Sequence, residues 1–207
     1  MLAIRRRLLG ADHPDTIKAI VNLGNAYSRQ QRLQDAEALY REALDTSRRV
    51  LGPDHPETLK STMLLANACL GQKRSEEAEG LYRQALEVSR RVLGPDHPDT
   101  LRLMLSLANA YSAEGRHAEA EAIYVDGLAT SRRVLGPNHP DTLQTIYNLG
   151  CSALRRGDRT AALRQLREAV ENGYGTARTL KDDPDLQPLG GDPEFEAIVA
   201  LAAKNRG

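Results

Sequence analysis

Apolar and small residues recur along the chain at spacings of three and four positions. Within residues 14–29 they form one stripe, made of Ile17, Ile20, Val21, Leu23, Gly24 and Tyr27. A second stripe follows in residues 33–44, made of Leu33, Ala36, Leu39, Tyr40, Ala43 and Leu44. Because this spacing places each stripe on one face of a helix, the pattern predicts two consecutive amphipathic helices. The polar segment SRQQR between the stripes predicts a short turn.

The predicted helix pair recurs at a fixed interval. His-Pro occurs at residues 13, 55, 97 and 139, so each unit is 42 residues long. We predict units over 13–54, 55–96 and 97–138, and a divergent unit over 139–174. Residues 1–12 are predicted to be the tail of a preceding incomplete unit, because AIRRRLLGADHP aligns with TSRRVLGPDHP. Helix pairs that contact mainly their neighbours build an all-α solenoid.

The motif NLGNAY, followed by a spaced alanine and LYREAL, resembles the tetratricopeptide repeat. The 42-residue unit with LGPDHPDTL at its joint resembles the variant of kinesin light chain and of many bacterial proteins. The resemblance covers residues 1 to about 174. It implies a right-handed α-α superhelix of antiparallel helix pairs.

Both ends of the chain depart from the repeat. The incomplete first unit leaves an apolar helix face without its neighbour, and we expect either a longer protein upstream or self-association through this face. In residues 175–207, Pro184 interrupts the chain, and Asp192 followed by Pro193 starts a final helix. We expect this segment to form capping helices that cover the last unit.

The charges balance, with 28 basic and 28 acidic side chains. A neutral chain whose charged residues are spread along the sequence does not favour binding to nucleic acid or to an anionic membrane. Cys69 and Cys151 lie far apart in the sequence, which disfavours a disulfide framework or a zinc site. No signal peptide or membrane-spanning run is visible in the sequence. Together these features predict a cytoplasmic protein with reduced thiols.

Four histidines stand at one repeat position, namely His13, His55, His97 and His139. Stacked helices lie about 10 Å apart, whereas zinc lies about 2 Å from its nitrogen ligands, so no two of them can share an ion. The Asp-His-Pro-Asp segments instead predict helix starts, with a capping acceptor and a proline in the first turn. The sequence contains no P-loop, zincin or GxSxG motif. We therefore predict a protein that is not an enzyme and that needs neither a cofactor nor a metal.

The family resemblance implies that the first helix of each unit lines a concave groove for extended peptides or partner helices. Asn25, Asn67 and Asn109 recur along this face. Their amides can bind a peptide backbone, or they can bond within their own helix pair. The basic residues at one edge favour a partner with some acidic character. The candidate binding residues are Lys18, Asn22, Asn25, Lys60, Met63, Asn67, Arg102, Leu105, Asn109, Tyr147 and Asn148.

These features predict a scaffold that binds a protein or peptide ligand through its concave groove. The resemblance to bacterial arrays leaves a second hypothesis, in which the repeats form the C-terminal regulatory or sensor region of a larger signalling protein. Such a protein would carry a kinase or a nucleotide-hydrolysing domain.

Overall fold

A computed structural model describes residues 2–204 of the chain. Within this range all regular elements are helices and no strand occurs. Met1 of the predicted N-terminal tail and residues 205–207 of the predicted capping segment lie outside the described residues. The chain divides into two compact units, Met1–Ala113 (unit 1) and Glu114–Gly207 (unit 2). Their boundary falls between the two helices predicted for residues 97–138.

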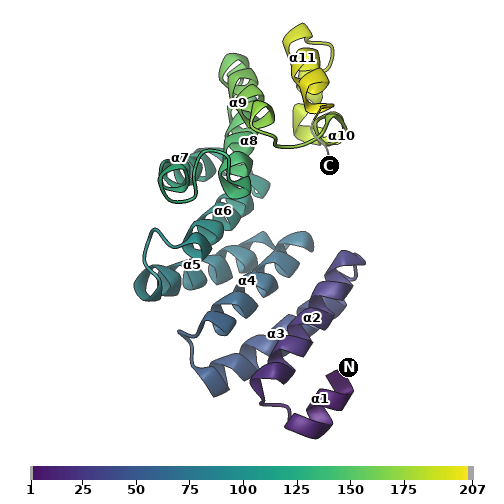
Figure 1. The fold of residues 1–207 in the computed structure, drawn as a ribbon, viewed down its shortest axis with the longest axis vertical. Helices are drawn as coiled ribbons and strands as arrows, with labels where there is room; N and C mark the ends of the chain where they lie inside the picture. Colours follow the sequence, from purple (N-terminus) through teal and green to yellow (C-terminus); the bar gives the residue numbers. More distant parts are fainter. Residues whose placement is uncertain (1, 205–207) are drawn as a thin grey trace. The chain divides into compact units, whose positions relative to one another are not determined.

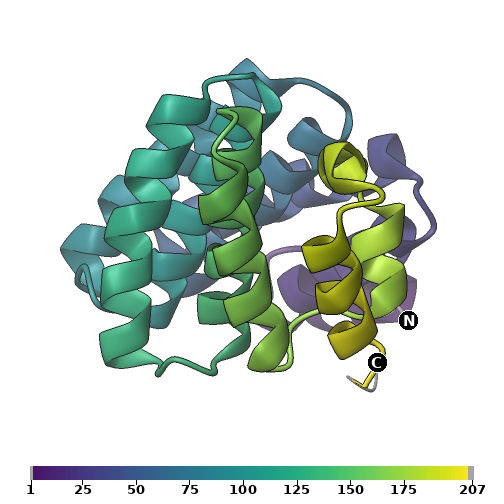
Figure 2. The same cartoon turned by 90° about the horizontal axis from the view of Figure 1, so that it is seen from above.

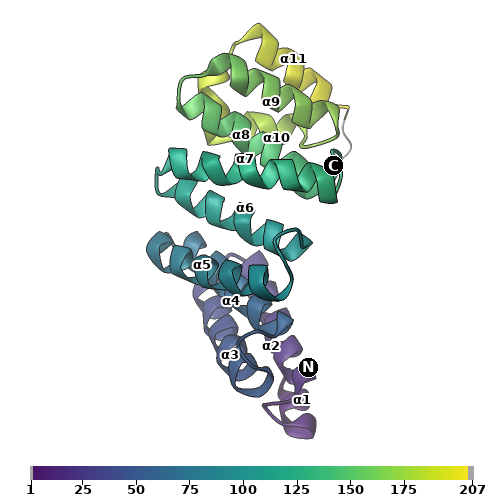
Figure 3. The same cartoon turned by 90° about the vertical axis from the view of Figure 1, so that its left-hand side faces the viewer.

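Unit 1 is a stack of helices in which each helix packs against the next along the chain (Figure 1). The first helix of one pair also contacts that of the following pair, because α4 meets α6. Figure 3 shows α2 to α5 from the side, as two successive helical hairpins. The helices are α1 (Leu2–Leu9), α2 (Pro14–Arg29), α3 (Leu33–Leu51), α4 (Pro56–Gly71), α5 (Ser75–Val92) and α6 (Pro98–Ala113).

Unit 2 begins with helices that pack consecutively, as in unit 1, and ends with shorter elements that do not follow the repeat. The helix α8 packs against both α7 and α9, after which a shorter set of elements follows. In this set α10 and α11 lie side by side, and α11 packs against α9 (Figure 2). The segment at Pro184 is a turn of 3-10 helix, η1, that packs against α8. The elements are α7 (His117–Val134), α8 (Pro140–Arg155), α9 (Arg159–Glu171), α10 (Ala177–Asp182), η1 (Pro184–Leu189) and α11 (Pro193–Ala202).

The first helix of each pair is capped by its histidine. The imidazole Nδ1 of His13, His55 and His97 accepts a hydrogen bond of 3.1 Å from the backbone N–H two residues later. The corresponding bond to His139 is 3.2 Å long. Each histidine therefore satisfies one of the free N–H groups at a helix start.

The aspartates before His13 and His55 pair with arginines of the second helices. Arg49 of α3 donates two hydrogen bonds to Asp12, of 2.5 and 2.6 Å, and Arg91 of α5 donates one of 2.7 Å to Asp54. Arginines near the ends of the second helices thus link successive joints, the Gly-Ala/Pro-Asp-His-Pro segments between helix pairs, along unit 1. This arrangement accounts for the recurrence of the second arginine of each pair and of the aspartate, whereas the first arginine, Arg48, donates to Gln84 of α5.

The helices of a pair approach closely where the first helix carries a small residue. A Cβ atom added to Gly24 would lie 2.6 Å from Cε1 of Tyr40, and the next pair has Ala66 in the matching place. Both Tyr40 and Tyr82 are almost completely buried, with exposed fractions of 2% and 0%. The side chains of the second helices therefore fill the space that small residues leave open.

The turn within the first two helix pairs contains a strained residue. Gln31 and Lys73 adopt φ angles of 61°, in the left-handed region that favours glycine. At the same repeat position unit 2 has Gly115 and Gly157, with φ angles of 78° and 82°. The left-handed conformation costs a residue with a Cβ atom roughly 1–2 kcal/mol.

We expect Lys73→Gly to raise the free energy of unfolding by about 0.5–1 kcal/mol, because relief of strain exceeds the entropy cost of glycine. Chemical denaturation monitored by circular dichroism would measure this change. Lys73→Ala is the matched control, since it removes the side chain but keeps the strain. Equal stability of the two variants would contradict the prediction.

We expect Gly24→Ala to destabilise the fold by about 1–3 kcal/mol, because the new methyl group overlaps the ring of Tyr40. The matched control is Gly80→Ala in α5, where an added Cβ would meet no atom within 4 Å. This control should instead stabilise the helix by about 0.5–1 kcal/mol. Thermal unfolding of both variants would test the contrast, and a change of the same sign in both would refute it.

Candidate peptide-binding face

The candidate binding residues of unit 1 lie on α2, α4 and α6, and those of unit 2 lie on α8. Their exposure divides them into three groups. The exposed side chains are Lys18, Asn22, Lys60, Asn67 and Arg102. The half-buried ones are Asn25, Met63, Leu105, Asn109 and Asn148, and the buried one is Tyr147.

Three of the candidate residues meet in one pocket of unit 1. Lys60, Met63 and Arg102 line a pocket of about 380 Å³ between the first turns of α4 and α6. Its apolar part includes Leu59, Leu93 and Leu103, and its polar part includes Glu57, Ser89 and Asp99. The pocket is therefore lined by apolar side chains together with a few charged and polar groups, a combination usual in binding sites.

Lys18, Lys60 and Arg102, the basic candidate residues, differ in whether an acidic side chain pairs with them. Arg102 forms an ion pair of 3.1 Å with Asp99, and Lys18 lies 3.9 Å from Asp15. Lys60 has no hydrogen bond or ion pair within residues 2–204. Its ammonium group is therefore the cation of this edge that is most available to an acidic partner.

The asparagines of the inner face are bonded to buried tyrosines. The hydroxyl of Tyr40 donates to Oδ1 of Asn25 at 2.8 Å, and the hydroxyl of Tyr82 donates to Oδ1 of Asn67. In unit 2, Tyr124 is hydrogen-bonded to Asn148. A buried phenol needs such a partner, so the carbonyl oxygens of Asn25 and Asn67 serve their own helix pairs. The sequence signal for this contact is the recurring distance of 15 residues between asparagine and tyrosine.

The sequence was compared with models of known protein families. The model of the tetratricopeptide repeat matches four overlapping segments, residues 2–48, 18–90, 60–132 and 107–173. The chain belongs to the tetratricopeptide repeat (TPR) family. This result confirms the family predicted from the sequence, and the helix pairs confirm the all-α solenoid. No curated protein matches the sequence.

Similar TPR structures agree with this assignment. One similar protein is a set of nearly identical TPR-like repeats assigned to a kinesin light chain of Podosopora anserina. Its sequence identity to this chain is 26%, and the match covers 83% of this chain and 81% of the other. Two crystal structures of these repeats give TM-scores of 0.70 and 0.68. BtubC (BKLC) from P. vanneervenii is 22% identical, with a TM-score of 0.76 and coverage of 97% and 85%, and shares the TPR fold.

The candidate residue Tyr147 does not lie on an open face, which corrects the sequence prediction. Only 5% of it is exposed, its hydroxyl donates to Asp183 before η1, and its ring centroid lies 5.0 Å from that of Tyr174. Nearby, Arg155 pairs with Asp185. The acidic start of η1 therefore covers this part of α8. The repeat pattern gave no signal for this contact, because the covering segment lies outside the TPR units.

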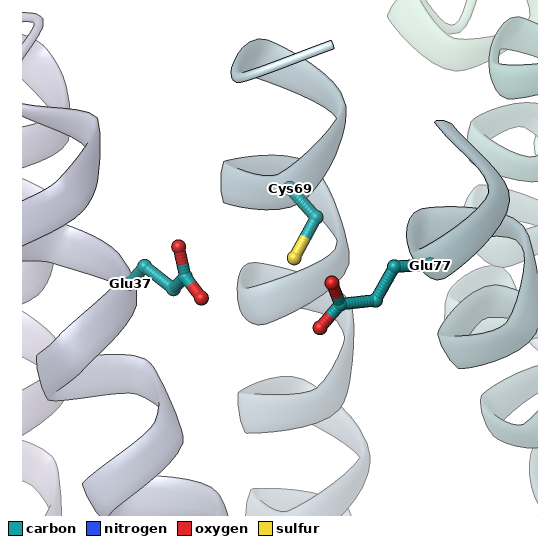
Figure 4. A group of neighbouring side chains, drawn as sticks. All are labelled: Glu37, Cys69 and Glu77. Carbon is teal, nitrogen blue, oxygen red and sulfur yellow. The ribbon is translucent and has the colours of Figure 1, made fainter. Parts of the chain in front are cut away.

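Glu37 of α3, Cys69 of α4 and Glu77 of α5 form a compact group with metal-ligating side chains in unit 1 (Figure 4). The two carboxylates are already engaged by cations, because Arg74 and Arg41 each bind both of them. Burial raises the pKa of the Cys69 thiol to about 11, which disfavours the thiolate that a metal would need. The group is therefore an ion-pair network that links successive TPR helices rather than a good metal site.

None of the helices in the described range is long and apolar enough to cross a lipid bilayer.

The ion-pair network predicts a dependence of stability on pH. The guanidinium of Arg74, 2.6 Å from Glu37, lowers the pKa of that carboxyl from 4.5 to about 2. The network therefore contributes stability above pH 4.5 that is lost as the pH falls toward 2. We expect Glu37 to account for on the order of 2 kcal/mol of this loss.

Denaturation curves of the wild type and of Glu37→Gln between pH 6 and pH 2.5 would measure this effect. The variant should be less stable at pH 6, and the difference should shrink on acidification. Glu87→Gln, an exposed position on α5, is the control. A constant difference across this pH range would contradict the assigned role of the ion pair.

Proposed function

We propose that the protein is a non-catalytic scaffold that binds a peptide or helical segment of another protein on the inner face of its first helices. The observation that carries this proposal is the pocket between α4 and α6. It joins two successive repeats at Lys60, Met63 and Arg102, three positions that the family resemblance assigned to ligand binding. Membership of the TPR family supports the proposal, since such repeats generally mediate contacts between proteins. We place this role in the cytoplasm, in keeping with the two unpaired cysteines.

The pocket indicates what kind of residues the partner presents. Leu59, Met63 and Leu103 offer an apolar surface for an aliphatic or aromatic anchor. Beside them Lys60 has no counter-ion among residues 2–204, so an acidic residue next to the anchor gains the most from it. The other cation of the pocket, Arg102, is paired with Asp99 and contributes less to this preference.

In this proposal, Asn25 and Asn67 mainly stabilise their own helix pairs rather than contact the ligand. Replacement of Asn67 by alanine would leave the buried hydroxyl of Tyr82 without its partner, at a cost of about 1–3 kcal/mol. A loss of binding in that variant would therefore mix binding with folding. Lys60 is the cleaner probe, because its exposed side chain makes no internal contact of this kind.

We expect Lys60→Glu to weaken binding of the selected peptide about tenfold or more, equivalent to about 1.4 kcal/mol. The peptide would first be selected from a library that combines apolar anchors with adjacent acidic residues, and its affinity measured by fluorescence anisotropy. Lys73→Glu is the matched control, because it makes the same charge change in the turn after α4. Equal affinities of the two variants would place the binding site elsewhere.

A further inference from the structure

Each first helix of unit 1 carries an acidic residue in its first turn and a basic residue three positions later. In α2 and α6 the two charges are joined in ion pairs of 3.9 and 3.1 Å, namely Asp15–Lys18 and Asp99–Arg102. In α4 the matching residues are Glu57 and Lys60. Neither of their side chains forms an ion pair within residues 2–204. The start of α4 therefore presents two opposite charges that are both unpaired.

The carboxylate of Glu57 also lacks a hydrogen-bond donor. Its Oε2 atom is buried and accepts no hydrogen bond from the described part of the chain. The side chain is one methylene group longer than those at the same position of the other first helices, Asp15, Asp99 and Asp141. A buried polar atom without a partner costs free energy until a donor reaches it. A donor supplied by a ligand would therefore be bound favourably at this oxygen.

Glu57 lies in the pocket between α4 and α6, together with Lys60 and Met63. The three residues follow one another at every third position, so each advances about 4.5 Å along the helix axis. Alternate residues of an extended peptide lie about 6–7 Å apart on one side of the strand. The long side chains of Glu57 and Lys60 can span this difference. The pocket thus presents an acid, a base and an apolar surface in that order.

We propose that Glu57 determines the specificity of this site, because it binds a basic side chain of the ligand. The ligand then carries a basic, an acidic and an apolar residue at alternate positions, for Glu57, Lys60 and Met63 respectively. This role of Glu57 rests on the proposed function and adds to it the basic residue and its place. A ligand with acidic residues alone uses only Lys60 and leaves the Glu57 oxygen without a donor.

Four short fluorescein-labelled peptides would test this assignment. Two of them present lysine, aspartate and leucine at alternate positions separated by alanines, in the order Lys-Asp-Leu or in the reverse order. Both orders are needed because the ligand can run in either direction along α4. In the other two peptides glutamine replaces the lysine. We expect one lysine peptide to bind about fivefold more tightly than its glutamine counterpart in fluorescence anisotropy.

Glu57→Gln separates the role of this carboxylate from that of Lys60. In this variant the tighter lysine peptide should lose about fivefold in affinity, whereas its glutamine counterpart should change much less. Glu87→Gln, at an exposed position on α5, is the matched control and should leave both affinities unchanged. Circular dichroism would show that the variants are folded. The comparison of the lysine and glutamine peptides on the unaltered chain is independent of any variant.

Three outcomes would overturn the role of Glu57. The first is equal binding of the lysine peptides and their glutamine counterparts, and the second is full affinity of the lysine peptide for Glu57→Gln. In both cases the proposed function stands if Lys60→Glu still weakens the glutamine peptide, which retains the aspartate. The third is the absence of binding by all four peptides. Binding of the library-selected peptide, and its sensitivity to Lys60→Glu, would then decide whether the proposed function falls as well.

Discussion

The close contact between the two helices of a pair is the constraint on which the rest of the repeat depends. Tyr40 lies directly over Gly24, and its hydroxyl donates to Asn25, the next residue of the same first helix. Tyr82 repeats the bond with Asn67. A small residue followed by asparagine on one helix, with a tyrosine on the other, therefore sets both the separation and the rotation of the pair. The rotation in turn decides which side chains of the first helix face the inner surface.

Charged residues have a different role from this apolar core. Most ion pairs of unit 1 are exposed, and such pairs each contribute about 0–1 kcal/mol. Their value lies in position, because Arg49 with Asp12 and Arg74 with Glu37 join one repeat to the next. Near the inner face, ion pairs also engage Lys18 and Arg102. Lys60 has no such partner within residues 2–204, which is why the proposed binding of an acidic residue is assigned to it.

The fold followed from the sequence because a fixed spacing constrains every repeat in the same way. The apolar stripes predicted α2 and α3, and the recurrence of His-Pro extended that prediction to the later pairs. Contacts that depend on a particular three-dimensional neighbour were not predictable. The histidine itself, rather than the aspartate before it, accepts the capping hydrogen bond. Tyr147 is covered by the segment around Asp183, which lies outside the repeats, so the periodicity of the sequence could not predict this contact.

The ion pairs at the helix starts have a consequence for how unit 1 responds to salt. Arg49–Asp12 and Arg91–Asp54 each connect residues 37 positions apart, close to the length of one repeat. Both pairs lie between exposed side chains, so added salt screens both of them. The buried contacts between helices are not screened in this way. Salt would therefore weaken the links between successive helix starts while the packing within each helix pair persists.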